Sequence, residues 1–155
     1  MEPRLNAYET APNAMKALYA LGGYVEKSSL ELPLQMLLSY RVSQLNGCAF
    51  CLDMHSKDLR AQGETEQRLY GLDAWHDAPY YSDRERAALA WAEALTTLRP
   101  GHVPDGVYEE ARLQFSSVEL VDLTMAVVTI NGYNRVNIAF RTPAGDYQPG
   151  QYSRA

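Results

Sequence analysis

Two cysteines and a histidine lie close together in the segment GCAFCLDMHSKD, which covers residues 47–58. Cys48 and Cys51 are the only cysteines of the chain, and His55 follows four residues after the second. On a helix these positions share one face, because they follow the spacing i, i+3, i+7. These three residues can carry out dithiol chemistry or supply three ligands to a metal. Alternatively, the two cysteines can be small buried residues of the core.

The cysteine pair lies at the start of a predicted helix. Gly47 permits a sharp turn into Cys48, which we expect in the first helical turn, where unpaired N–H groups and the helix dipole favour a thiolate. An activated cysteine in such a setting has a pKa of roughly 3.5 to 7.5, against about 8.5 for a free thiol. His55, one turn beyond Cys51, can accept the proton of that thiol or stabilise its anion.

Other cysteine sites can be weighed against this one. A c-type haem site needs a histidine directly after the second cysteine, where this chain has Leu52, so that site is excluded. A thioredoxin-type site requires a βαβ framework, which the sequence lacks. Zinc requires a fourth ligand beside the cysteines and His55, and nothing in the spacing of His76 or His102 indicates either of them. Because a fourth ligand is not indicated, we expect no bound metal. We also expect no cofactor, since the sequence has no flavin or nicotinamide fingerprint.

Composition and charge limit the possible partners. The 155 residues are 46% hydrophobic and 21% charged, as in a globular protein of one domain, and the 19 acidic and 14 basic residues give a net charge of −5. No basic run marks a nucleic-acid surface. The N-terminal MEPRLNAYETAPNAMK lacks the apolar core of a signal peptide, and LTMAVVTI is too short to cross a bilayer. We therefore expect a cytoplasmic protein without nucleic-acid or membrane partners.

Helix start and stop signals recur along the chain, whereas alternation of apolar and polar residues is scarce, so we predict an all-α protein of about six to seven helices. The predicted segments are residues 15–25, 33–46, 48–63, 64–72, 82–98, a short piece from Pro104 and a long helix after Ser116. The tail from Thr142 is rich in Pro, Gly and Tyr and is predicted to be an irregular arm. Several helices carry apolar residues on more than one face, which favours an oligomer.

The residues around the cysteine pair resemble a known family. The run RVSQLNGCAFCLDMHSKDLRAQGETEQRLYGLDAW at 41–75, followed by ERAALAWAEALT at 85–96, resembles the alkylhydroperoxidase D-like branch of the carboxymuconolactone decarboxylase superfamily. ELVDLTMAVVTINGYNRVNIAF at 119–140 is similar to the family's C-terminal helix. The pattern S-x-x-N-G-C-x-x-C-x-x-x-H is far more specific than two cysteines alone.

This resemblance implies an all-helical homotrimer or homohexamer with thiol-dependent peroxidase activity. In such enzymes the second cysteine, here Cys51, attacks the hydroperoxide and becomes a sulfenic acid, while His55 assists proton transfer. Cys48 then resolves the sulfenic acid as a disulfide. An external dithiol, thioredoxin-like or lipoyl-like, reduces the pair again.

Two positions depart from the family pattern. A glutamate of the proton relay often stands twelve residues before the first cysteine, where this chain has Met36. Some members carry a second histidine directly before the second cysteine, where this chain has Phe50. Tyr40 and Ser43 follow Met36 at i+4 and i+7, so their hydroxyls are candidates to replace part of the relay.

Three hypotheses follow from these residues. The first is a thiol-dependent alkylhydroperoxidase or dithiol-disulfide oxidoreductase of antioxidant defence. The second is a non-enzymatic redox-sensing or scaffold oligomer, which Met36 and Phe50 favour. The third is a lactone decarboxylase-like or zinc-binding protein, although the decarboxylating branch works without the C-x-x-C pair that this chain has.

Overall fold

The computed structural model describes residues 2–98 and 102–152. Within these ranges the chain forms eight α-helices and one 3-10 turn and contains no strand, which confirms the all-α prediction. The elements are α1 (Ala7–Thr10), α2 (Pro12–Glu26), α3 (Leu32–Asn46), α4 (Ala49–Ala61), α5 (Glu66–Gly71), η1 (Leu72–Ala74), α6 (Asp83–Thr96), α7 (Asp105–Gln114) and α8 (Ser117–Phe140). The predicted segments correspond to α2 through α8, and α1 is an additional helix.

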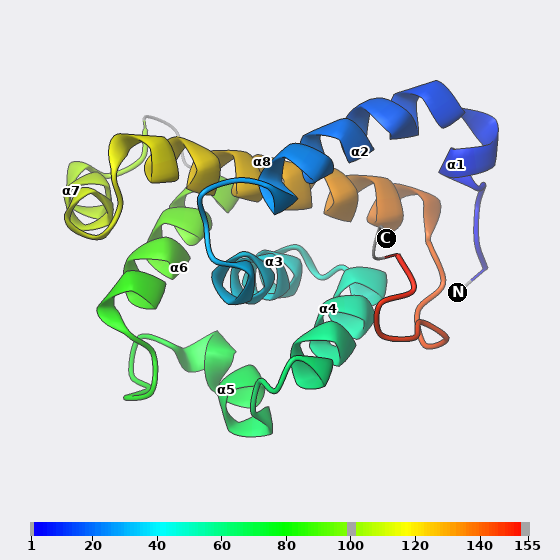
Figure 1. Cartoon of the computed structure of the whole chain (residues 1–155). Coiled ribbons are helices and arrows are strands. Elements are labelled where there is room, and N and C mark those ends of the chain that lie inside the picture. Colours follow the sequence, from blue (N-terminus) through cyan, green and yellow to red (C-terminus); the bar gives the residue numbers. More distant parts are fainter. Residues whose placement is uncertain (1, 99–101, 153–155) are drawn as a thin grey trace.

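The helices pack around α3, as Figure 1 shows. α3 contacts α4, α6 and α8, while α2 lies along α8 and α7 packs against α6. The main core joins apolar residues of α3, α6 and α8, with Leu38, Val42, Ala88, Ala92, Leu123 and Val127 among its least exposed members. α3 therefore stands at the centre of the fold, and its C-terminal end leads directly into the cysteine segment.

The connection from α3 to α4 is a tight turn. Gly47 adopts the left-handed conformation with φ 68°, which ends α3 at little steric cost because glycine has no Cβ. The N–H of Cys48 then donates to the carbonyl of Ser43 at 3.1 Å. Cys48 has an extended backbone and is the N-cap of α4, so the prediction that it lies within the first helical turn was wrong by one position.

The chain after α8 is irregular in residues 142–152 and runs along α4 (Figure 1). The Lys57 ammonium donates to the carbonyls of Gly145 at 2.8 Å and Tyr147 at 3.0 Å. The Tyr147 hydroxyl donates to the Asp58 carboxylate at 2.8 Å, and Tyr147 is buried. This C-terminal arm is thus fastened to the helix that follows the cysteines.

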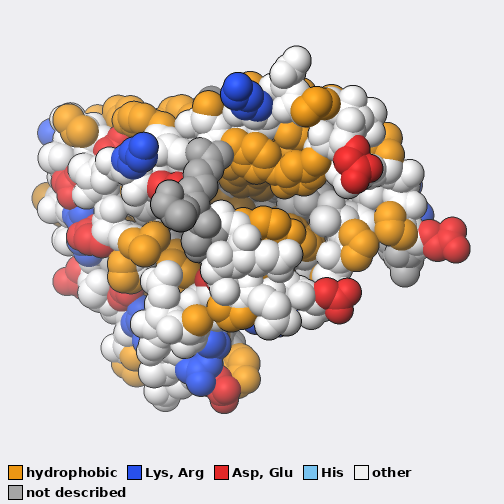
Figure 2. Space-filling model, turned by 45° about the vertical axis from the view of Figure 1, so that its right-hand side comes forward, with side chains coloured by type: hydrophobic (Ala, Val, Ile, Leu, Met, Phe, Trp, Pro, Cys, Tyr) orange, Lys and Arg blue, Asp and Glu red, His pale blue; other side chains and the backbone are white. Residues whose placement is uncertain are grey.

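Several large apolar side chains remain exposed. They include Leu113 on α7 and Val118, Val121 and Val128 on α8. Figure 2 shows, on one face of the molecule, apolar side chains gathered in and around a hollow. Patches of this kind are typical of protein interfaces, and the oligomer stays a prediction.

No single helix within the described ranges is long and apolar enough to cross a membrane. α7 and α8 satisfy the length and composition requirements only when they are taken together, and they are bent by 119° at their junction.

Candidate functional site

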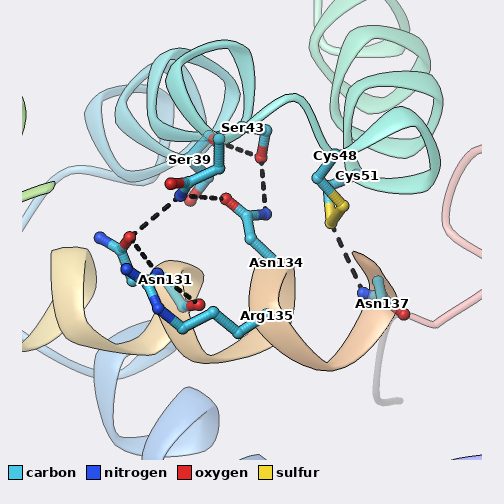
Figure 3. Close-up of a disulfide and its surroundings, with 9 residues drawn as sticks. Ser39, Ser43, Cys48, Cys51, Asn131, Asn134, Arg135 and Asn137 are labelled. Carbon is cyan, nitrogen blue, oxygen red and sulfur yellow. Dashed lines mark hydrogen bonds between the residues drawn. A yellow bond between two sulfur atoms is a disulfide. The ribbon is translucent and has the colours of Figure 1, made fainter. Parts of the chain in front are cut away.

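Cys48 and Cys51 form a disulfide at the start of α4 (Figure 3). Their Cα atoms lie 5.4 Å apart, within the ordinary range for a disulfide, and each residue is only 1% exposed. The two sulfurs that the sequence placed on one helix face therefore do meet.

His55 lies one turn beyond Cys51 on α4. Part of the residue is accessible, but its Nε2 is buried and has no hydrogen-bond partner in the described part of the chain. Burial lowers the pKa of His55 to about 4, and the nearby Asp58 carboxylate opposes this effect only in part. The imidazole is therefore neutral near pH 7, and a neutral imidazole has one nitrogen that can accept a proton.

Asn137 on α8 contacts Cys51, although the sequence alone does not indicate this residue. Its Nδ2 donates to the Sγ of Cys51 at 3.5 Å, and the residue is only 8% exposed (Figure 3). The two residues are 86 positions apart in the chain, so no local pattern links them. The signal that the sequence offers is three asparagines at three-residue intervals, at positions 131, 134 and 137 of this helix.

Asn131 and Asn134 of α8 contact the C-terminal end of α3 (Figure 3). Asn46 donates through its Nδ2 to the Oδ1 of Asn131 at 3.0 Å and to that of Asn134 at 2.9 Å. Asn134, which is fully buried, donates to the Ser43 hydroxyl at 3.0 Å. Because buried polar groups are costly unless they are paired, these bonds fix the position of α8 relative to the turn that carries the cysteines.

Ser43 and Tyr40 contact other groups than the sulfurs. The Ser43 hydroxyl donates to the carbonyl of Ser39 at 2.7 Å and accepts from Asn134. Tyr40, whose pKa is raised mainly by burial, lines a pocket of about 600 Å³ together with residues of α4 and α5, among them Ser56 and Tyr70. Within the described ranges no hydrogen bond joins either hydroxyl to a cysteine or to His55, so the relay role stays a prediction.

The two other histidines have different surroundings, and His102 is exposed. His76 stacks on Trp75 with ring centroids 3.6 Å apart, and its Nε2 lies 3.7 Å from a carboxylate oxygen of Glu93. No group of three or more His, Cys, Asp and Glu side chains in the part of the chain that the structure describes is arranged to hold a metal ion.

The sequence matches the carboxymuconolactone decarboxylase family over residues 12–94, a range that includes both cysteines and His55. The chain belongs to this family. YdfG of Bacillus subtilis, an uncharacterized protein, is 42% identical to it over 139 residues, which are 90% of this chain and 95% of that protein.

Solved structures agree with this assignment. A protein of unknown function from Agrobacterium tumefaciens, described as a candidate antioxidant defence protein AhpD, has a TM-score of 0.90 and 38% identity and covers 94% of this chain and 100% of its own. This neighbour supports the alkylhydroperoxidase D-like branch of the family. The debrominase Bmp8 has a TM-score of 0.79, 19% identity and coverage of 89% and 74%, so it shares the fold alone.

Proposed function

We propose that the protein is a thiol-dependent hydroperoxidase in which Cys51 attacks, Cys48 resolves and His55 assists proton transfer. The observation that carries this proposal is the Cys48–Cys51 disulfide at the start of α4, one turn before a neutral imidazole with an unpaired nitrogen. Membership of the family and the AhpD-like neighbour support the same chemistry.

The proposed reaction has three steps. The Cys51 thiolate attacks the terminal oxygen of the hydroperoxide, the O–O bond breaks, and the alkoxide leaves as an alcohol after it takes a proton. Sulfur loses two electrons and becomes a sulfenic acid. Cys48 then attacks that sulfur, the S–S bond forms, and hydroxide leaves as water with the proton of the Cys48 thiol. An external dithiol finally returns two electrons to the disulfide and is itself oxidised.

His55 is suited to the first step as a proton acceptor. Since its pKa is about 4, the ring is neutral near pH 7 and can take the proton of the Cys51 thiol while the thiolate forms. The protonated ring can then return this proton to the departing alkoxide. Its weak basicity limits this assistance, because the best catalytic pKa lies near the working pH.

A second candidate function is redox sensing without peroxide turnover. Met36, a half-buried thioether on α3, occupies the position of the family's relay carboxylate, and the disulfide sulfurs belong to residues only 1% exposed. A pair of this kind can switch between dithiol and disulfide and still turn over little substrate.

Peroxide consumption with a generic dithiol as the reductant tests the first function. We expect turnover in the wild type and none in Cys51→Ser. Cys48→Ser should react once and leave a sulfenic acid on Cys51 that mass spectrometry can trap. Absence of turnover in a wild type that still forms the disulfide supports the sensor instead, and a trapped sulfenic acid on Cys48 in the Cys51→Ser variant reverses the roles of the cysteines.

A further inference from the structure

A buried amide from α8 faces the sulfur of Cys51. Asn137 Nδ2 lies 3.5 Å from the Cys51 Sγ and donates to it, and both residues are almost inaccessible (Figure 3). An amide N–H does not ionise near neutral pH, so it can act only as a fixed donor. In the reduced protein the same donor would face the thiol or thiolate of Cys51.

The two cysteines occupy unequal surroundings. Cys48 is the N-cap of α4, where the helix dipole favours a thiolate, but its side chain makes no capping hydrogen bond. Cys51 is the third residue of α4 and receives the bond from Asn137. The helix start therefore favours a thiolate at Cys48, whereas the hydrogen bond from Asn137 favours a thiolate at Cys51. Of these two stabilising effects, the hydrogen bond to a charged group is the stronger.

The donor is held in place by its helix. Asn131 and Asn134, on the two preceding turns of α8, are bonded to Asn46 at the end of α3, and Asn134 also binds Ser43. These bonds fix the distance between α8 and the α3–α4 turn. A donor that is already positioned stabilises a developing charge without the cost of reorganising.

The charged groups on the surrounding elements have other partners. Arg41 on α3 binds Asp73 and Glu93, Lys57 on α4 binds Asp53 and the arm, Asp58 accepts from Tyr147, and Arg135 on α8 binds Asn131. His55 on α4 is neutral. The amide of Asn137 is therefore the donor that the described hydrogen bonds assign to the Cys51 sulfur.

We propose that Asn137 is a catalytic residue whose amide stabilises the Cys51 thiolate and thereby makes Cys51, rather than Cys48, the attacking thiol. The proton of that thiol leaves to His55 or to solvent. The consequence for turnover rests on the proposed hydroperoxidase function, whereas the effect on the thiol does not.

The rate of alkylation by iodoacetamide as a function of pH tests this proposal, because it reports the pKa of each thiol in a single-cysteine background. In Cys48→Ser, the additional change Asn137→Leu should raise the pKa of Cys51 by about one unit and so move the midpoint of its alkylation profile to higher pH by the same amount. Asn137→Asp should raise the pKa of Cys51 further, because a carboxylate repels the thiolate. In Cys51→Ser, Asn137→Leu should leave the pKa of Cys48 unchanged.

Thr129→Val is the matched control on α8. Thr129 is also buried, but its hydroxyl donates to the carbonyl of Met125 within the helix, so its loss should not shift the Cys51 pKa. Circular dichroism melts show whether each variant is folded. A comparison that needs no Asn137 variant is available as well: the pKa of Cys51 in Cys48→Ser should lie below that of Cys48 in Cys51→Ser.

Two results overturn the proposal: a Cys51 pKa that stays constant or falls in folded Asn137→Leu, and a Cys48 pKa below that of Cys51 when each is measured alone. Failure of the hydroperoxidase function is a separate outcome. If the pKa values shift as expected but the wild type consumes no peroxide, Asn137 still selects the thiolate and only the proposed reaction is wrong.

Discussion

His55 links the candidate site to the stability of the fold. Its pKa of about 4 lies below the ordinary histidine value of about 6.5, so the unfolded chain binds more protons than the folded chain between these two values. Stability is therefore fully present above about pH 6.5 and is lost as the pH falls through 4. The depressed pKa corresponds to a loss on the order of 3 kcal/mol.

We expect His55→Leu to remove most of this pH dependence. Urea unfolding of the wild type should show a free energy that drops between pH 7 and pH 4, while the variant should show a much smaller drop over the same range. His76→Leu is the control, because His76 is largely exposed and its loss should leave the wild-type profile intact. A variant that loses stability as steeply as the wild type would show that other groups cause the effect.

Met36 sets the expected speed of the reaction. A thioether neither accepts nor delivers a proton, and general acid-base assistance contributes typically about 10² to 10⁴ in rate, so turnover should be slow rather than absent. We expect Met36→Glu to raise peroxide turnover by about ten-fold or more. The variant should also be less stable, because its half-buried carboxylate lacks an assigned partner, and thermal melts at pH 7 measure that cost.

Two controls accompany Met36→Glu. Met36→Gln has nearly the same shape without an ionisable group and should not gain turnover. Tyr40→Phe in the wild type tests whether the tyrosine has taken over the relay. If Met36→Glu is folded with reactive Cys51 but unchanged turnover, while Tyr40→Phe lowers wild-type turnover, the description of an impaired site is wrong.

At the scale of the elements, a buried arginine ties α3 to α6 and η1. Arg41 is 6% exposed and binds Glu93 at 2.7 Å and Asp73 at 2.6 Å, and Glu93 also accepts from the indole N–H of Trp75 at 2.7 Å. The two ion pairs are not equivalent, since the Asp73 side chain is 82% exposed and that of Glu93 is 23% exposed.

Loss of Glu93, the more buried partner of Arg41, should therefore destabilise the fold far more than loss of the exposed Asp73. We expect Glu93→Ala to destabilise the fold by about 3 kcal/mol, because it leaves the Arg41 guanidinium buried with one exposed partner. Asp73→Ala should cost less than about 1 kcal/mol. Urea denaturation of both variants checks the contrast, and equal losses would contradict it.

Features that depend on neighbouring residues were predictable from the sequence. Ser82 and Ser116 form capping boxes with Glu85 and Glu119, and the sequence pattern S-x-x-E indicates both because these bonds span only three residues. Gly63, the last residue of the predicted segment 48–63, has φ 93° and lies two residues beyond the end of α4. The Cys48–Cys51 pairing was predictable for the same reason, because the two residues are only three positions apart.

Features that depend on tertiary packing were not predictable from the sequence. Asn137 reaches Cys51 only because α8 packs across the α3–α4 turn, and Arg41 finds its partners 32 and 52 residues later. α1 was also missed, although Asn6 caps it by accepting from the backbone N–H groups of Tyr8 and Glu9. A four-residue helix carries too little apolar periodicity to be distinguished from a turn.

At the scale of the whole molecule, the exposed apolar residues of α7 and α8 bear on the assembly. Val118, Val121 and Val128 are each about half exposed or more, and Leu113 is 82% exposed. Contact between copies of the chain would bury this apolar surface, which is the main favourable term in protein association. We therefore expect light scattering at micromolar concentration to give the mass of an oligomer, a trimer or hexamer by resemblance to the family.

Val121→Glu tests whether α8 contributes to that contact. A charge placed within a buried apolar interface is costly, so the variant should shift toward the monomer mass while its circular dichroism spectrum stays that of the wild type. Tyr70→Glu is the matched control, because Tyr70 is 76% exposed on α5, away from these valines in the chain. A wild type that scatters as a monomer would contradict the oligomer itself. An oligomer that survives Val121→Glu but dissociates in Tyr70→Glu would instead place the contact on α5, beside the Tyr40 pocket, where a second copy would restrict access to that pocket.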